Sequence, residues 1–199
     1  MSMNRFESTR AFSSTSRRRV FGALTLSAAT LLWSGPAFAQ SRTANASDQA
    51  FVTAAAQGGM AEVAEGKLAA SKTNDRAVKA FAEKMVTDHT KANDRLMAIA
   101  KKGGFELPAS VGPENEQQKA SLTKLGGKTF EIAYLDGQEK GHAKMELVFQ
   151  KEISNGKNPD LVAFAKTTLP VVEEHLSLAK SDSVKVEANT TGGRGTKAQ

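Results

Sequence analysis

The chain has 199 residues, of which 27 are Lys or Arg and 21 are Asp or Glu, and it contains no cysteine. The absence of cysteine excludes disulfides, thiolate metal sites and cysteine nucleophiles, so packing has to stabilise the fold. The formal net charge is +6, but five basic residues and one acidic residue fall within residues 1–39, which leaves +2 for the rest. Such a small surplus predicts no nucleic-acid partner.

Residues 1–39 have the composition of an export signal. A basic region, an apolar run and a small-x-small motif for signal peptidase follow one another: Arg5, Arg10 and Arg17 to Arg19, then residues 21–33, then Ala37-Phe38-Ala39. The run is too short to span a membrane. We therefore expect cleavage before Gln40, a mature chain without a transmembrane span, and a periplasmic or other cell-envelope location.

The expected partners of this segment are signal peptidase and the export machinery. Ser16 to Phe21 resembles the twin-arginine export motif. A general secretory signal that carries three arginines would give the same pattern, so the sequence leaves the export route open.

The mature chain shows helical periodicity in four long segments. The first predicted helix covers residues 48–71 with Ser47 as its N-cap, and its inward stripe of mostly small residues lets a neighbour approach closely. The second is capped by Asn74 and ends at Lys101-Lys102-Gly103, where cations and a glycine favour a helix C-terminus. Residues 103–127 then form a connection long enough to cross a bundle, with a short helix predicted over residues 114–125.

The third long helix is predicted over residues 128–154. The fourth begins at Asn158-Pro159 and ends near residue 180, with Pro170 expected to kink or split it. Residues 181–199 are polar and lack an apolar period, which predicts a disordered tail. The predicted fold class is all-α: a four-helix bundle over residues 40–180 with a long connection between the second and third long helices.

Three histidines, His89, His142 and His175, lie on the apolar stripes of three different long helices. Glu62 occupies the equivalent inward position on the first helix. At about 1.5 Å of rise per residue, these four residues lie within about one turn of the same level when the helices alternate in direction. The spacing therefore brings three imidazoles and a carboxylate into one layer of the bundle.

This layer has the ligand types of a mononuclear transition-metal site. The sequence predicts that a single Zn, Fe or Cu ion binds to Glu62, His89, His142 and His175. Several acids nearby are candidates for orienting the rings: Asp88, Glu65, Glu139, Glu146, Glu173 and Glu174. Asp88 lies toward the edge of its stripe, which also fits an ordinary surface acid. The alternative to metal is a buried hydrogen-bonded network that fixes the helix register.

Four segments carry recognisable motifs: Phe51–Ala69, Phe81–His89, Gln138–His142 and Leu169–His175. The elements Met-Val-x-Asp-His and Leu-Pro…His are the most specific of them. Together they resemble the bacterial domain of unknown function 4142 family over residues 49–179. The resemblance implies an exported, ferritin-like four-helix protein, and the family has no established biochemical role.

Ferritin-like di-iron sites use Glu-x-x-His pairs, but only Glu139 and His142 have this spacing here. Val86 and Val172 stand at the other two matching positions, so a di-iron centre is not expected. No nucleophile elbow, phosphate loop or paired-carboxylate motif is present, and we expect no catalytic residues.

The sequence therefore leaves three functions open. The leading one is an exported, non-enzymatic bundle that binds one metal ion. The second is a metal-free structural or stress-related interaction protein of the cell envelope, and the third is a metal-dependent oxidoreductase. The substrate, the partner and any homo-oligomeric state stay undefined.

Overall fold

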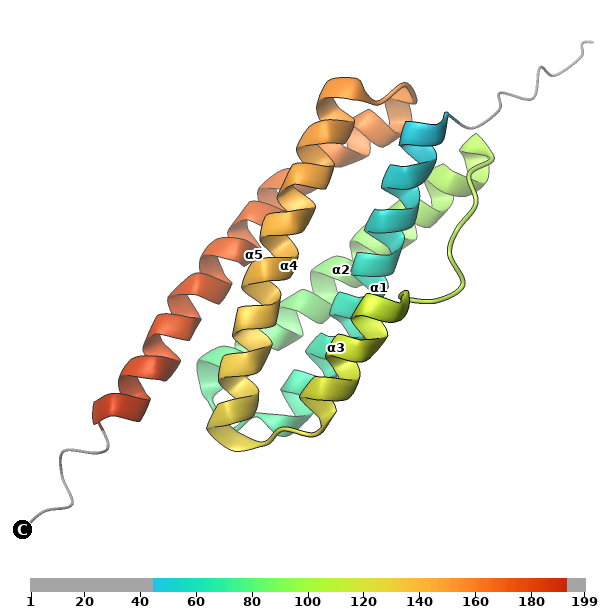
Figure 1. Ribbon diagram of the computed structural model, residues 1–199. Helices are drawn as coiled ribbons and strands as arrows, with labels where there is room; N and C mark the ends of the chain where they lie inside the picture. The colour runs from blue at the N-terminus through green and yellow to red at the C-terminus, as the bar shows by residue number, and fades with distance from the viewer. Residues whose placement is uncertain (1–44, 193–199) are drawn as a thin grey trace, which may run out of the picture. The chain divides into compact units, whose positions relative to one another are not determined.

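A computed structural model describes residues 45–192, which form four long α-helices and one short one (Figure 1). The helices are α1 (Ala46–Lys72), α2 (Arg76–Gly103), α3 (Pro113–Thr123), α4 (Gly127–Asn155) and α5 (Pro159–Gly192). The predicted export signal and the last seven residues of the predicted tail lie outside the described residues. No helix within residues 45–192 combines the length and the apolar character that crossing a membrane requires.

The four long helices form a bundle in which α1 and α5 each pack against both α2 and α4. Helices α1 and α5 begin at one end, because the Asp48 carboxylate accepts the backbone N–H groups of Lys157 and Asn158, both at 2.9 Å. Helices α2 and α4 begin at the other end, where Lys128 lies 4.0 Å from Asp75. Helices α2 and α4 are therefore parallel. The segment between them crosses the bundle from end to end, as predicted.

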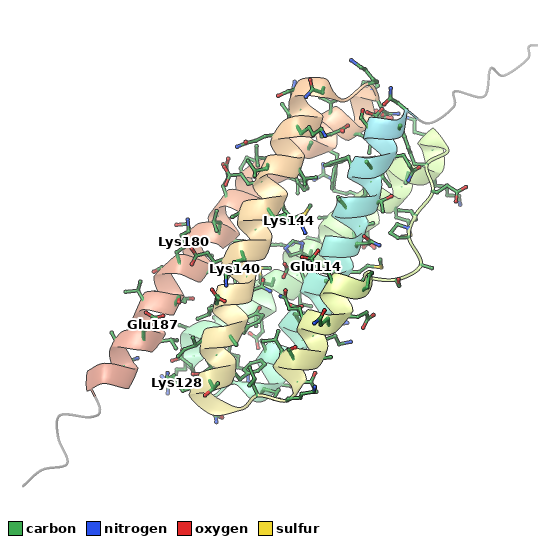
Figure 2. All side chains as sticks on the ribbon, viewed as in Figure 1. Glu114, Lys128, Lys140, Lys144, Lys180 and Glu187 are labelled. Carbon is green, nitrogen blue, oxygen red and sulfur yellow. The ribbon has the colours of Figure 1, made fainter. Side chains whose placement is uncertain are left out.

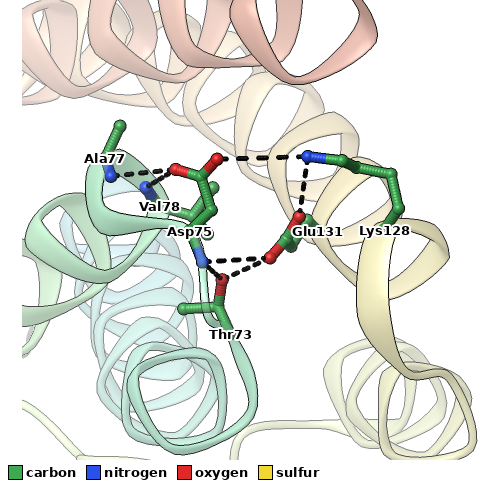
Figure 3. Close-up of polar contacts among 6 residues, drawn as sticks. All are labelled: Thr73, Asp75, Ala77, Val78, Lys128 and Glu131. Carbon is green, nitrogen blue, oxygen red and sulfur yellow. Dashed lines mark hydrogen bonds and ion pairs between the residues drawn. The ribbon is translucent and has the colours of Figure 1, made fainter. Parts of the chain in front are cut away.

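Polar contacts join the turn between α1 and α2 to the start of α4 (Figure 3). The Thr73 hydroxyl donates to Oε1 of Glu131 at 2.6 Å, and the backbone N–H of Asp75 donates to the same oxygen at 3.3 Å. Lys128 lies 3.2 Å from Oε2 of Glu131. These bonds satisfy the buried Glu131 carboxylate and hold the ends of three helices together.

Both predicted N-caps of the first two helices are wrong by one or two residues. Asn45, not Ser47, caps α1, because its Oδ1 accepts the backbone N–H of Ser47 at 2.9 Å. Asp75, not Asn74, caps α2, because its Oδ1 accepts the first N–H groups of that helix. Each helix start offers two capping residue types side by side, and only the backbone conformation decides between them.

The apolar core has two parts, one toward each end of the bundle. One part is built around Phe51, Phe149 and Phe164, with the first two ring centroids 5.2 Å apart. The other part is built around Phe130 and Tyr134. The apolar residues that recur with the helical period on α4 and α5 are buried here, as this period predicts, among them Leu135, Phe149, Leu161 and Leu176. The histidines lie on the same stripes, between these two apolar parts.

Helices α1 and α2 pack closely because glycines of α1 face α2. A Cβ atom on Gly66 would lie 2.9 Å from the main-chain oxygen of Ala82 and 2.9 Å from a methyl group of Val86. A Cβ atom on Gly59 would overlap the side chain of Asn93. The close approach predicted from the small-residue stripe is confirmed, and the buried face of α1 is wider than predicted.

Helix α5 corrects two expectations. It runs without interruption from Pro159 to Gly192, so Pro170 does not split it and the tail predicted as disordered from Ser181 is helical as far as Gly192. Pro170 removes one backbone donor, and the helix tolerates that loss. Val186 is 1% exposed and packs in the Phe130 part of the core, seven residues after the buried Ala179. This contact continues the apolar stripe past residue 180.

Candidate metal centre

His89 of α2, His142 of α4 and His175 of α5 meet in the middle of the bundle. Each histidine has one ring nitrogen that lies within 4.8 Å of a ring nitrogen of both other histidines. The centroids of the three rings are 5.3, 5.4 and 5.6 Å apart. Within residues 45–192, this is the one group of three or more histidine or acidic side chains with such spacing. The layer predicted from the axial positions therefore forms for the three histidines.

His142 is oriented by its own helix. Its Nδ1 lies 2.8 Å from the main-chain oxygen of Gln138, one turn earlier, and a carbonyl can only accept, so Nδ1 carries the proton. The lone pair is then on Nε2, which is buried and has no hydrogen-bond partner among the described residues. Burial lowers the pKa of His142, and the Gln138 carbonyl opposes that effect only in part. His142 is therefore neutral at pH 7 with a free nitrogen.

His175 is oriented by a carboxylate on another helix. Its Nε2 donates to Oδ2 of Asp88 at 3.2 Å, and Lys84 donates to the same oxygen at 2.9 Å. Lys84 in turn lies 3.3 Å from Glu174. Burial lowers the pKa of His175 by more than Asp88 raises it. The other nitrogen, Nδ1, is buried and has no partner within the described part of the chain.

Asp88 has the orienting role that the sequence predicted for one of several acids. Its side chain is 24% exposed, so it is not an ordinary surface acid. Burial acts to raise its pKa, but the hydrogen bonds from Lys84 and His175 hold that pKa below its usual value. Asp88 is thus ionised and fixes which nitrogen of His175 carries the proton.

His89 completes the group from the side of α2. Burial, together with the neighbouring His142 and His175, lowers the pKa of His89 to about 3, and the charge of Asp88 acts in the opposite direction. Its Nε2 is buried without a partner among residues 45–192. Each of the three rings therefore has one buried nitrogen that no group within residues 45–192 satisfies, although burying a polar atom in this way costs free energy.

Glu62 lies beside this group. Its Oε1 is 3.9 Å from Nδ1 of His142, the nitrogen that already bonds to Gln138. Its Oε2 is buried and has no partner in the described structure. Burial raises the pKa of Glu62 to about 7, with a hydrogen bond from Gln138 acting in the opposite direction. That Glu62 is a fourth metal ligand stays a prediction.

A small cavity adjoins the histidines. It has a volume of about 30 Å³, and its polar lining comes from Glu62, His89, His142, Asn93 and Thr168. The hydroxyl of Thr168 is buried without a partner within residues 45–192. The rest of the lining is mainly apolar, and the volume suits one water-sized ligand. Sequence reasoning missed Thr168, although it lies two turns before His175 on the same helix.

The other acids expected near the rings lie elsewhere. The Glu65 carboxylate accepts hydrogen bonds from Gln118 and Gln138 at 3.0 and 3.1 Å. Burial raises the pKa of Glu65 to about 7, with the charge of Glu62 adding to the rise. The remaining candidates do not join the histidine group: Glu139, Glu146 and Glu173. Sequence reasoning also missed Gln118, which comes from the short helix α3.

The donor set fits a borderline transition metal. Neutral imidazole suits zinc, copper and iron, and three buried lone pairs match the protein ligands of an open mononuclear site. A di-iron ligand set does not form, because Glu139 is absent from the histidine group. The cavity beside His89 and His142 leaves room for a fourth ligand.

Comparison with known proteins identifies the domain but not its role. The family described as "Domain of unknown function (DUF4142)" matches residues 34–181. No curated protein matches the chain. The crystal structure of a DUF305 fragment from Deinococcus radiodurans is similar, with a TM-score of 0.64 and 13% sequence identity over 71% of this chain and 98% of that chain. At that identity the likeness shows the helical fold alone.

Proposed function

The chain belongs to the DUF4142 family, and we propose that its ferritin-like bundle binds a single transition-metal ion through His89, His142 and His175. Two observations carry this proposal: one ring nitrogen of each histidine lies within 4.8 Å of those of the other two, and each ring has a buried nitrogen without a hydrogen-bond partner among the described residues. A bound cation would satisfy all three at once. Hydrogen bonds on the opposite nitrogens of His142 and His175 orient these rings as metal ligands are usually oriented.

The residues favour zinc, iron or copper over a hard cation, because imidazole nitrogen is a borderline ligand. A metal ion held here would supply Lewis acidity beside the 30 Å³ cavity. Glu62 and Thr168 line that cavity with unpartnered oxygens. Glu62 would serve either as the fourth ligand or as the acceptor for a bound water.

We also propose that the protein is exported to the cell envelope. Support comes from the order of basic region, apolar run and cleavage motif within residues 1–39. Mass spectrometry of the protein from the envelope fraction tests this, and a first residue of Gln40 is expected. Replacing Arg17 and Arg18 with lysine then tests the route, because unchanged export of that variant argues against the twin-arginine pathway.

Elemental analysis tests the metal proposal. The protein is purified from its own cell envelope without chelator or affinity tag, beside a His89→Ala, His142→Ala, His175→Ala triple variant. We expect near-stoichiometric metal in the first and none in the folded second. A His89→Gln variant, which retains a polar side chain of similar size, serves if the triple variant does not fold. Metal in neither protein, or equal metal in wild type and variants, would contradict the proposal.

A metal-free role as a structural bundle is the second candidate. It is favoured by the fact that His142 and His175 each already bond to a protein partner. In that case the histidines only fix the packing of α2, α4 and α5, and added metal leaves the melting temperature unchanged. A metal that binds the native state raises the melting temperature with its concentration, so a thermal titration separates the two candidates.

A further inference from the structure

A second pocket lies on the other side of Glu62, between α1, α3 and α4. It has a volume of about 150 Å³ and contains the carboxylates of Glu62 and Glu65. Glu114 of α3 and Lys144 of α4 also line it, and they form an ion pair at 2.9 Å that joins those two helices (Figure 2). The short helix α3 therefore covers a pocket that contains two buried acids.

Among the described residues, neither acid forms an ion pair with a lysine or arginine, and the charge of Lys119 is the smallest of the influences on Glu65. Glu65 is 2% exposed, and both groups that bond to its Oε2 are uncharged amides, from Gln118 and Gln138. Lys144, the one lysine or arginine among the residues that line the pocket, is paired with Glu114. Buried carboxylates are normally paired with a cation or bound to a metal ion. The pocket thus has the charge of a cation site.

Three oxygen atoms in this region lack hydrogen-bond partners within the described residues: Oε2 of Glu62, Oε1 of Glu65 and Oε1 of Gln138. All three are buried, and Gln138 and Glu65 are almost fully so, at 0% and 2% exposed. The Gln138 side chain donates to both carboxylates, which keeps the three groups together. Of these, the two carboxylates line the pocket, and carboxylate oxygens are the ligands that hard divalent cations prefer.

We propose that the pocket beneath α3 binds one hard divalent cation, such as Mn²⁺, through the Glu65 and Glu62 carboxylates, which both line the pocket and each have a buried oxygen without a hydrogen-bond partner among the described residues. This site is separate from the histidine site, because none of its ligands is a histidine. The two sites are neighbours, since Glu62 lines both cavities and Gln138 bonds to His142 through its main-chain oxygen. The proposal does not depend on a metal ion at the histidines.

Glu65→Gln is the decisive variant. It lines only the pocket beneath α3, and glutamine keeps the size and polarity of the side chain while removing the charge. Glu83→Gln makes the same change in charge at an exposed position of α2 and is the matched control.

Mn²⁺ binding is measured by electron paramagnetic resonance at pH 7.5 on protein freed of metal. We expect one Mn²⁺ per chain, a dissociation constant raised at least about tenfold in Glu65→Gln, and no change in Glu83→Gln. A His89→Gln variant should bind Mn²⁺ as the wild type does. The proposal is overturned if the wild type binds no Mn²⁺, if Glu65→Gln binds it normally, or if His89→Gln loses it.

The same variants separate this proposal from the histidine site. Zn²⁺ binding is expected to fall in His89→Gln and to persist in Glu65→Gln. If Zn²⁺ binds but Mn²⁺ does not, the proposed site beneath α3 is wrong and the histidine site is retained. If Mn²⁺ binding depends on Glu65 while Zn²⁺ does not bind, only the histidine site fails.

Discussion

Oδ2 of Asp88 lies 3.2 Å from Nε2 of His175 and accepts a second hydrogen bond from Lys84 at 2.9 Å. Asp88 thereby holds the proton on Nε2 and leaves the lone pair on the buried Nδ1 of His175. Asp88→Ala removes this control while changing little of the core. We expect metal affinity to fall about 10- to 100-fold, measured by competition with a chromophoric chelator.

Asp94→Ala is the control for that measurement, because Asp94 is an exposed carboxylate on the same helix. Equal affinities of the Asp88 and Asp94 variants would mean that Asp88 does not orient a metal ligand. Asp88→Asn should lie between the wild type and Asp88→Ala, since its amide oxygen can still accept from Nε2.

The level of the histidines could be predicted because the rise and period of a helix fix the height and the face of each residue. The contacts of Asp88 could not be predicted in the same way. A residue at the edge of a stripe reaches either solvent or a neighbouring helix, and its side-chain rotamer decides which. Thr168 and Gln118 were missed for a related reason. Each is a polar residue, so it adds nothing to the apolar periodicity from which the inward faces of the helices were predicted.

A second prediction concerns Thr73 and Glu131. Thr73→Val keeps the shape of the side chain but removes the hydroxyl that donates to the buried Oε1 of Glu131 at 2.6 Å. We expect the free energy of unfolding to fall by about 1–3 kcal/mol, measured in urea. Thr129→Val, an exposed position near the start of α4, controls for the loss of a hydroxyl. Equal stability of the two variants would contradict the prediction.

A third prediction uses two glycines of α1 with opposite expected signs. A Cβ atom on Gly66 would meet the main chain of Ala82 at 2.9 Å, whereas one on Gly58 would lie 3.6 Å from the Met145 sulfur, an ordinary contact. Gly66→Ala should destabilise the bundle by about 1–3 kcal/mol. Gly58→Ala should stabilise it by up to about 1 kcal/mol, because alanine favours a helix. If thermal unfolding shows that both variants are more stable than the wild type, or that both are less stable, the packing argument is wrong.

A fourth prediction concerns pH and Glu152. Burial raises the pKa of Glu152 from 4.5 to about 7, with the charge of Asp48 adding to the rise. An unfolded chain releases this proton above pH 4.5, so the folded state holds the extra proton and stability falls as pH rises from 4.5 through 7. Glu152→Gln should therefore unfold with a free energy about 2 kcal/mol higher than the wild type at pH 8.

The gap between the free energies of unfolding of the two proteins should narrow as the pH falls toward 4.5 and close below it, where Glu152 becomes protonated in both the folded and the unfolded state. Urea unfolding of both proteins at a series of pH values between 4 and 8 measures this gap. Subtracting one free energy of unfolding from the other cancels the titration of groups that the two proteins share. Glu83→Gln should show no such dependence, because Glu83 is exposed. A gap that does not change with pH would rule out the raised pKa as its cause.

A fifth prediction tests the end of α5. Val186 is 1% exposed and Val184 is 67% exposed. Val186→Ala should lower the free energy of unfolding by about 1–2 kcal/mol, and Val184→Ala should leave it within about 0.5 kcal/mol. The two measurements also decide whether residues beyond 180 contribute to the fold. If Val186→Ala leaves the free energy of unfolding unchanged, the residues beyond 180 do not contribute to the fold and the prediction of a tail is right.

The sequence pattern missed this part of α5 because one valine among polar residues is a weak signal. The stripe continues through Ala179, Asp182 and Val186, and the middle position is a buried acid that pairs with Lys185 at 2.8 Å. A polar residue on an apolar stripe lowers the mean hydropathy without removing the period. Composition and periodicity then give opposite predictions, and the packing follows the period.

The Asp48 carboxylate also bears on the order in which the bundle can assemble. Its two donors, the backbone N–H groups of Lys157 and Asn158, lie 109 and 110 residues later in the chain. During synthesis, α1, α2, α3 and α4 are all made before either donor exists. An unfinished chain therefore exposes a carboxylate that only the start of the last helix can cover. The Asp48 carboxylate therefore gains these two hydrogen bonds only after residues 157 and 158 have been made.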